Sequence, residues 1–485
     1  MSGPFRVVPT DQHPGHGRNN QALAEAAEQA DGDLTEDGLA RWFVRTYGGY
    51  RRVHDRNKWL KWDGSRWRYD STAAIFADIR AFLRTRSRND APDEPTRKRL
   101  RSAQTVAAVE RLCQSERAWA TTSDQWDADP WVLCTPGGVI NLRTGSLTPS
   151  DPTQLHTKQT AVTPAGECPK FIEFLRVITD GDDEFVAFLQ RFFGLTLTGS
   201  IREHMLAVGY GNGRNGKGVL TTVIAGMLGD YAQTAPMETF TETRGERHPT
   251  DLAGLAGARL VIASETEEGR QWNASRIKAL TGGDKISARF MRGDFFEFQP
   301  TFKLFVTGNH RPRLRSVDEA MRARLLLIPF TVTIPPERRD PDLAEKLRQE
   351  WPGILNWALA GCLDYQSRGL APPSRVREAT ASYFGVQDTF GAWLDESCER
   401  GKPTSGIRPR SCLRAGSGTP RALGNRSGGR LSSPTAWSRP ASLRVGMAVA
   451  DFGRVSPLNP VTRGRNDNHD NLLHFIRMCA RARTS

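Results

Sequence analysis

The sequence lacks the features that mark membrane, secreted and zinc-ribbon proteins. No run of about 18 apolar residues occurs, which argues against a membrane-spanning helix. Residues 1–6 lead into no apolar stretch of the kind that forms a secretory signal. The seven cysteines are scattered and form no C-x-x-C pair, so neither a structural zinc site nor a disulfide framework is expected. These absences predict a protein of a reducing, cytoplasmic compartment without a membrane partner.

Acidic residues are nearly missing from the C-terminal part of the chain. Residues 401–485 hold 15 Lys and Arg against 3 Asp, so +12 of the formal net charge of +13 lies there. The preceding 400 residues are close to neutral, and nucleic-acid binding must therefore be argued from local sites. Residues 401–465 are rich in Gly, Pro, Ser and Arg and show no apolar period, which predicts disorder. A shifted reading frame would produce the same composition, and the two alternatives stay open.

A chain of 485 residues is too long for one compact domain. The pattern predicts an α/β protein with five parts. These are a mobile leader (1–35), a Trp-rich α+β domain with a helical linker (36–200), an α/β core (201–335), a helical segment (336–398) and the basic tail (399–485).

Seven of the twelve tryptophans lie between residues 42 and 131. Residues 59–67 have the pattern of a β-hairpin that turns at Asp63-Gly64. The tryptophans could form a surface on which nucleic-acid bases stack. Packing in the core of a small domain is the alternative that we favour, because large aromatic side chains usually serve packing first.

A glycine-rich loop carries the clearest chemistry. Apolar residues from 205 run into Gly211-Asn212-Gly213-Arg214-Asn215-Gly216-Lys217-Gly218, and helical residues follow. A strand, such a loop and a helix form a phosphate-binding loop, in which backbone amides surround the β-phosphate and Lys217 reaches the β- and γ-oxygens of ATP. Gly218 stands where the pattern has a Ser or Thr that ligates Mg²⁺. Thr221 and Thr222 follow about one helical turn later, which is a poor position for that role.

Two later strands end in residues that suit ATP hydrolysis. The apolar run 258–264 leads into Glu265 and Glu267. We assign Glu265 to Mg²⁺ and Glu267 to the base that activates water, although the two roles could be exchanged. The run 302–308 ends at Asn309, whose amide is a candidate sensor of the γ-phosphate. Arg322 and Arg324 precede a further strand, and either could act as an arginine finger on a neighbouring subunit's ATP.

The order of these motifs resembles that of superfamily 3 helicases, and more closely the helicase region of phage and plasmid primases of the satellite-phage and poxvirus type. Residues 276–289, Arg-Ile-Lys-Ala-Leu-Thr-Gly-Gly-Asp-Lys-Ile-Ser-Ala-Arg, resemble an element that general phosphate-binding-loop proteins lack. The resemblance covers residues 36–398. It implies an AAA+-like ATPase that forms a ring, usually a hexamer, with ATP between subunits.

The resemblance also implies how DNA is held. A hairpin within the third element would enter the channel of the ring, with strands 287–290 and 295–298 and a tip at 291–294. Arg292 is then the expected phosphate contact on single-stranded DNA, supported by Lys285 and Arg289. The expected function is an ATP-dependent helicase of phage, prophage or plasmid replication in a bacterial cytoplasm. Because only about 35 residues precede the Trp-rich domain, we expect primase activity to come from a separate protein.

Two other functions compete with this one. Gly218 could leave a protein that binds nucleotide without turnover, such as a prophage remnant. An origin-binding initiator is the third possibility, and the sequence offers no clear recognition helix for it.

Overall fold

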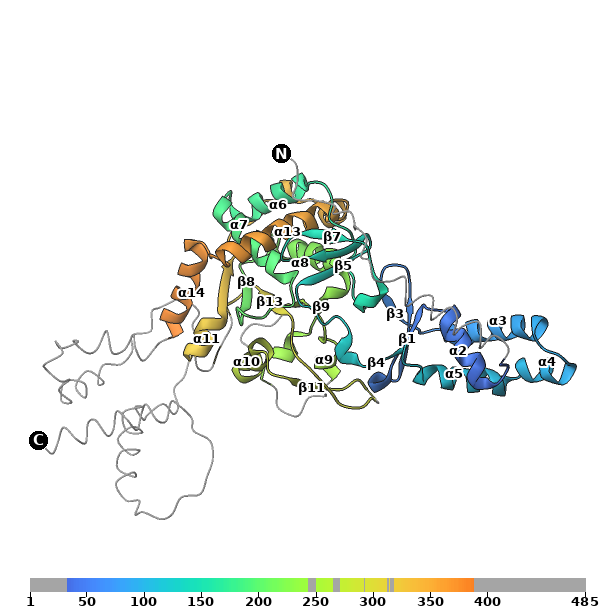
Figure 1. Ribbon diagram of the computed structural model, residues 1–485. Helices are drawn as coiled ribbons and strands as arrows, with labels where there is room; N and C mark the ends of the chain where they lie inside the picture. The colour runs from blue at the N-terminus through green and yellow to red at the C-terminus, as the bar shows by residue number, and fades with distance from the viewer. Residues whose placement is uncertain are drawn as a thin grey trace, which may run out of the picture. The chain divides into compact units, whose positions relative to one another are not determined.

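The computed structural model describes residues 33–242, 250–264, 271–291, 293–311, 314 and 318–387. The described residues up to Phe384 form one compact unit (Figure 1). Within the described residues, no helix is both long and apolar enough to cross a membrane. The basic tail and almost all of the predicted leader lie outside the described residues.

The front domain, defined here as residues 36–126, has a four-stranded sheet in the order β3-β2-β1-β4 and two hydrophobic clusters. Its elements are α2 (Glu36–Thr46), β1 (Tyr50–Val53), the 3-10 turn η1 (His54–Arg56), β2 (Lys58–Trp62), β3 (Trp67–Tyr69), α3 (Ala74–Asn89), α4 (Glu94–Leu100), α5 (Ala103–Ser115) and β4 (Ala120–Thr121). The predicted hairpin is confirmed, with Trp62 opposite Trp67. Asp63 closes its turn by accepting hydrogen bonds from the amides of Ser65 and Arg66.

The tryptophans of the front domain serve packing. Trp67 and Trp119 are 0% and 1% exposed, and Trp59 is 8% exposed. Trp59 and Trp119 meet edge to face at 5.9 Å between ring centroids. The indole of Trp59 donates a hydrogen bond to the buried Glu110 carboxylate at 2.7 Å. The packing interpretation is therefore confirmed for these three rings, which have no free face for a base.

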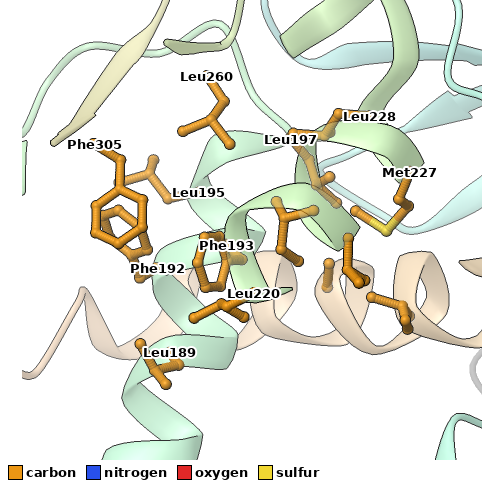
Figure 2. Close-up of a cluster of buried hydrophobic side chains, with 14 of the residues drawn as sticks. Leu189, Phe192, Phe193, Leu195, Leu197, Leu220, Met227, Leu228, Leu260 and Phe305 are labelled. Carbon is orange, nitrogen blue, oxygen red and sulfur yellow. The ribbon is translucent and has the colours of Figure 1, made fainter. Parts of the chain in front are cut away.

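The middle segment, residues 132–196, shares its apolar core with the α/β domain that follows. It contains the three-stranded sheet β5 (Val132–Thr135), β6 (Gly138–Asn141) and β7 (Ser146–Thr148), and the helices α6 (Pro169–Thr179) and α7 (Asp183–Thr196). Phe192 and Phe193 of α7 lie 5.6 and 6.0 Å from the ring of Phe305. Figure 2 shows these rings in one buried cluster with Leu220, which belongs to the helix after the loop.

Five parallel strands form the central sheet, in the order β14-β8-β13-β10-β9. They are β8 (Leu206–Tyr210), β9 (Ala232–Thr234), β10 (Leu260–Ser264), β13 (Lys303–Gly308) and β14 (Leu325–Pro329). β8, β10 and β13 are almost entirely buried, as expected for parallel strands that are covered on both faces. In the sheet, β13 lies between β8, which leads into the glycine-rich loop, and β10.

The remaining elements surround this sheet. They are α8 (Lys217–Leu228), α9 (Thr250–Ala253), α10 (Ala274–Gly282), α11 (Glu319–Arg324), α12 (Leu343–Arg348), α13 (Trp351–Arg368) and α14 (Ser374–Gln387), with the antiparallel pair β11 (Ile286–Ala288) and β12 (Phe296–Phe298). α13 packs along α7. Glycines permit this close approach, because a Cβ on Gly194 would lie 2.2 Å from the amide nitrogen of Cys362. Within the segment predicted to be helical, 336–398, the described residues contain α12, α13 and α14.

Candidate nucleotide-binding site

The glycine-rich loop connects β8 to α8, as predicted, and its backbone requires glycine at two positions. Gly211 has φ +152°, and a Cβ there would lie 1.9 Å from the carbonyl oxygen of Phe330. Gly216 has φ +81°, and its Cβ would lie 2.5 Å from Cγ2 of Ile178. Arg214 is left-handed with φ 66°, and its carbonyl accepts a hydrogen bond from the amide of Ile334 at 2.9 Å. The loop is therefore held in one shape by its neighbours.

Asn215 braces the loop from within. Its side chain is 3% exposed, and its Nδ2 donates to the carbonyl oxygens of Asn212 and Phe330 at 3.0 and 2.9 Å. Lys217 is 7% exposed, and its Nζ donates to the carbonyl oxygen of Gly211 at 2.6 Å. Burial lowers the pKa of Lys217 to about 8. The ammonium thus lies across the loop with a backbone carbonyl as its partner, where an incoming phosphate would be a stronger one.

The N-terminal end of α8 is open to an anion. Gly216 caps the helix without a side-chain hydrogen bond, and the first turn contains no acidic residue. The amides and the dipole of a twelve-residue helix therefore face the loop without a competing carboxylate. Gly218 is exposed, and a Cβ there would meet no atom within 4 Å. Thr221 donates its hydroxyl to the carbonyl oxygens of Lys217 and Gly218 at 3.1 and 3.0 Å, which engages it away from the site.

The carboxyl ends of three neighbouring strands meet beside the loop. Tyr210 of β8 lies opposite Gly308 of β13, and Thr307 lies opposite Ser264 of β10. The hydroxyls of Ser264 and Thr307 are 3.3 Å apart. Glu265 and Glu267 follow Ser264 directly in sequence, and both lie outside the described residues.

An open hollow of about 380 Å³ lies at this edge. Its lining comprises Tyr210, Gly211, Asn212, Asn309, His310, Arg311 and Thr331. Asn309, the predicted sensor, is thus placed beside the first two residues of the loop. Arg311 was not singled out from the sequence. Its guanidinium donates to the hydroxyl of Tyr210 at 3.3 Å and lies 5.1 Å from the centre of that ring.

The two candidate arginine fingers lie near the start of β14, away from the hollow's lining. Arg322 is exposed, and its guanidinium covers the ring of Phe384 at 5.0 Å. Arg324 donates to the carbonyl oxygen of Ala320 at 2.9 Å, while its buried Nε has no hydrogen-bond partner among the described residues. Neither guanidinium lines the hollow of its own chain.

Antiparallel strands form where the resemblance implied a hairpin, and they are shorter than expected, at 286–288 and 296–298. Ile286 pairs with Phe298 and Ala288 with Phe296. Lys285 is exposed at its start, and the guanidinium of Arg289 lies 4.6 Å from the ring centre of Phe295. Arg292 lies outside the described residues. Three apolar side chains are exposed near this tip, and the sequence pattern did not predict their exposure. They are Phe290, Met291 and Phe295, at 51%, 72% and 61%.

The described residues contain no group of three or more His, Cys, Asp or Glu side chains that could hold a metal ion. The carboxylates assigned to Mg²⁺ lie in the segment that the structure leaves undescribed. The open space at Gly218, at the start of a helix that lacks a capping side chain, is compatible with a hydrated cation beside bound phosphates.

Two family models match the chain. A model described as "D5 N terminal like" matches residues 40–180. A model described as a family of unknown function, DUF5906, matches residues 209–324, which include the glycine-rich loop, Asn309, Arg322 and Arg324.

Several viral proteins are similar in sequence. "Putative helicase 022R" of Frog virus 3 (isolate Goorha) is 29% identical over 235 residues, covering 43% of this chain and 24% of that protein. "Putative helicase L207/L206" of Acanthamoeba polyphaga mimivirus is 28% identical over 219 residues, 41% of this chain and 23% of that protein. "Putative helicase 184R" of Invertebrate iridescent virus 6 is 27% identical over 242 residues, 47% of this chain and 25% of that protein. The matched part spans about a quarter of these relatives.

Solved structures of the C-terminal region of NrS-1 are similar in backbone. One apo structure has a TM-score of 0.47 at 12% identity and covers 74% of this chain and 77% of that chain. Another, of residues 305–718, has a TM-score of 0.45 at 12% identity, with 74% and 81% covered. By sequence, the chain is therefore similar to a D5 N-terminal-like domain over its front part and to helicase-named viral proteins.

Proposed function

We propose that the chain is the ATP-driven motor of a DNA helicase that acts in phage, prophage or plasmid replication. The observation that carries the proposal is a loop that Asn215 braces and that the buried Lys217 crosses to reach Gly211, next to a hollow lined by Asn309 and Arg311. The names of the similar viral proteins support the same function. The placement of the Asn309 strand between β8 and β10 supports an AAA+-like ATPase of superfamily 3.

Each site residue then has a role in hydrolysis. Lys217 and the amides at the start of α8 bind the phosphates of ATP. Glu265 holds Mg²⁺, which supplies neutralisation of the phosphate charge when it is bound, and Glu267 orients the attacking water. Asn309 hydrogen-bonds the γ-phosphate or that water. Arg311, held by Tyr210, adds positive charge from the same chain at the mouth of the hollow.

The remaining roles require other molecules. In a ring, usually of six copies, Arg322 or Arg324 acts on the ATP of the neighbouring subunit, which agrees with the absence of both side chains from the lining of their own chain's hollow. The β11–β12 hairpin grips single-stranded DNA through Lys285, Arg289 and Arg292. A separate primase would provide the primers.

Strand separation tests this function. The full chain with ATP and Mg²⁺ should unwind a forked DNA duplex, and Lys217→Ala should abolish unwinding while leaving the far-ultraviolet circular dichroism unchanged. Arg348→Ala, at an exposed residue paired with Glu345, is a control that should keep full activity. Unwinding by the Lys217→Ala variant at the wild-type rate would refute the proposed motor.

A second candidate function is favoured by one residue. Gly218 lacks the hydroxyl that the usual loop offers to Mg²⁺, so the site could bind nucleotide for assembly without turning it over. Gly218→Ser is a clean test, because a Cβ at this helical position meets nothing within 4 Å. A motor tolerant of Gly218 predicts less than about a threefold change in hydrolysis rate. A rise of about 100-fold or more, which corresponds to about 2.7 kcal/mol, would support the second function.

A further inference from the structure

The outer face of α3 in the front domain carries a row of arginines that none of the proposed roles uses. Arg80, Arg84 and Arg88 follow one another at intervals of four residues, with Phe76 one interval before them. Residues four apart lie on the same side of a helix. All four are exposed, Phe76 at 37%. We call these four residues the α3 stripe.

Arg86, on the same helix, has a structural role, because it contacts other residues of the front domain. Arg86 is only partly exposed, and its guanidinium lies 3.7 Å from the ring centre of Trp42. It also forms an ion pair with Asp90 at 3.2 Å. By contrast, no described residue forms an ion pair with Arg80, Arg84 or Arg88. Among the described residues, the arginines of the stripe therefore lack the ion pair and the ring contact that hold Arg86.

The local sequence makes this row unfavourable for the isolated chain. No acidic residue occurs between Asp78 and Asp90. Like charges four residues apart on a helix destabilise it, and surface helices usually relieve them with interspersed Glu. A stripe of three unrelieved arginines is explained if a negatively charged partner covers it.

The next helix extends the same positive region. α4 packs against α3, and the hydroxyl of Ser87 donates to the carbonyl oxygen of Arg97 at 3.3 Å (Figure 1). Lys98 and Arg101 are exposed and also have no ion pair within the described part of the chain. Arg99 differs from them, because it pairs with Glu36 at 3.1 Å.

We propose that the α3 stripe, together with Lys98 and Arg101, binds the phosphate backbone of a nucleic acid, separately from the hairpin. Arginine forks match phosphate oxygens in two-point hydrogen bonds. Four residues of helix rise about 6 Å, so the three arginines form a row along which the phosphates of one strand can lie. Phe76 places an aromatic face at the end of the row, where a base of a single strand can stack. The site goes beyond the proposed motor function and does not depend on ATP.

Salt-dependent DNA binding by the full chain tests the site. The test variant is Arg80→Gln/Arg84→Gln/Arg88→Gln, since Gln keeps the helix propensity and part of the side chain. The matched control is Arg176→Gln/Arg348→Gln/Arg368→Gln, which removes the same charge from exposed arginines that have ion pairs. Fluorescence anisotropy with a labelled single-stranded oligonucleotide, without nucleotide, gives the affinity across a salt series.

Loss of three phosphate contacts should lower the slope of log affinity against log salt by about 2 and the affinity at 0.1 M salt by about 100-fold. The control should change both far less. Equal behaviour of the test and control variants would overturn the proposal. Binding to polyglutamate that is lost in the test variant, with DNA binding kept, would also overturn it and point to an acidic protein.

Two further readouts separate this site from the proposed motor. The test variant should keep the ATP hydrolysis rate of the wild type in the absence of DNA, and its thermal midpoint should not fall. The same drop in salt slope should appear when the stripe is changed in a Lys285→Gln/Arg289→Gln background. The motor could fail while this DNA binding persists, and a drop that vanishes in the hairpin background would contradict an independent site.

Discussion

At the scale of single residues, Gly211 is the loop position at which an added side chain would clash most severely. Its φ of +152° and a Cβ that would lie 1.9 Å from the oxygen of Phe330 exclude any side chain without backbone movement. We expect Gly211→Ala to lower the free energy of unfolding by about 2 kcal/mol or more and to weaken nucleotide binding. Gly213→Ala is the matched control, because its Cβ meets nothing within 4 Å. Chemical denaturation of both variants checks this, and equal stability would contradict the loop geometry.

Lys217 predicts a pH dependence of nucleotide affinity. Burial lowers the pKa of its ammonium to about 8 in the free protein. A bound phosphate favours the charged form and raises that pKa, so above pH 8 binding must take up a proton. The affinity for a non-hydrolysable ATP analogue should fall between pH 8 and pH 9.5, by at most about tenfold per pH unit.

Lys217→Arg provides the control for this profile. The guanidinium stays charged over the whole range, so whatever affinity the variant retains should be flat with pH. A wild-type affinity that is equally flat from pH 8 to pH 9.5 would show that the ammonium is not the titrating group.

Single residues also mark where sequence reasoning stops. The loop from Gly211 to Gly218 was predicted because its spacing is local in the sequence. Arg311 and Tyr210 were missed, since they are 101 residues apart and meet only when β8 and β13 pair. Exposed arginines are common, and nothing in the sequence distinguishes one that faces a hollow.

At the scale of elements, two buried cations hold the end of α7. Lys303 is 3% exposed, and its Nζ donates to the carbonyl oxygen and, at 3.2 Å, to the hydroxyl of Thr198. Arg259, 5% exposed, donates to the carbonyl oxygens of Leu197 and Val132. Carbonyls at a helix C-terminus attract cations. These contacts tie the residue before β10 and the first residue of β13 to the C-terminal end of α7 and, through Val132, to the start of β5.

Lys303 gives a stability prediction with a defined sign. Burial lowers its pKa well below the ordinary 10.5, so the unfolded chain binds more protons between the folded and unfolded pKa values. The stability contributed by the wild-type side chain therefore rises with pH up to about 10.5. Lys303→Met should lower the free energy of unfolding by about 1–3 kcal/mol at pH 7, because the Thr198 carbonyl loses its donor.

Denaturation of wild type and Lys303→Met at pH 7 and pH 9 checks both statements. The stability difference between the two proteins should be larger at pH 9. A difference that shrinks as pH rises would mean that Lys303 is stabilised in its charged form.

Elements with local signatures were predictable. The β2–β3 hairpin was predicted from a strand pattern around a short turn, the β11–β12 hairpin was implied by the resemblance, and both form. The contacts of Lys303 and Arg259 with the C-terminal end of α7 were not predictable. In a sequence, a Lys or Arg near the start of a strand looks like a surface residue. Only tertiary packing brings Leu197 and Thr198 within hydrogen-bonding distance of Arg259 and Lys303.

At the scale of the whole molecule, two features could not be predicted from overall composition. Residues 132–196 share a core with the central sheet through Phe192, Phe193 and Phe305, although they precede the glycine-rich loop by many residues. The near-neutral charge of the first 400 residues also concealed the α3 stripe, because acids elsewhere balance its arginines in the sum. The net charge of a chain cannot locate a charged surface, whereas arginines spaced four residues apart on a helix can.

The measurement that tests the central claim most directly is the rate of ATP hydrolysis by the full chain with Mg²⁺, with and without single-stranded DNA. The account predicts hydrolysis that DNA stimulates several-fold and that Lys217→Ala removes. Nucleotide binding in the absence of any hydrolysis above the Lys217→Ala rate, with or without DNA, would contradict a working motor.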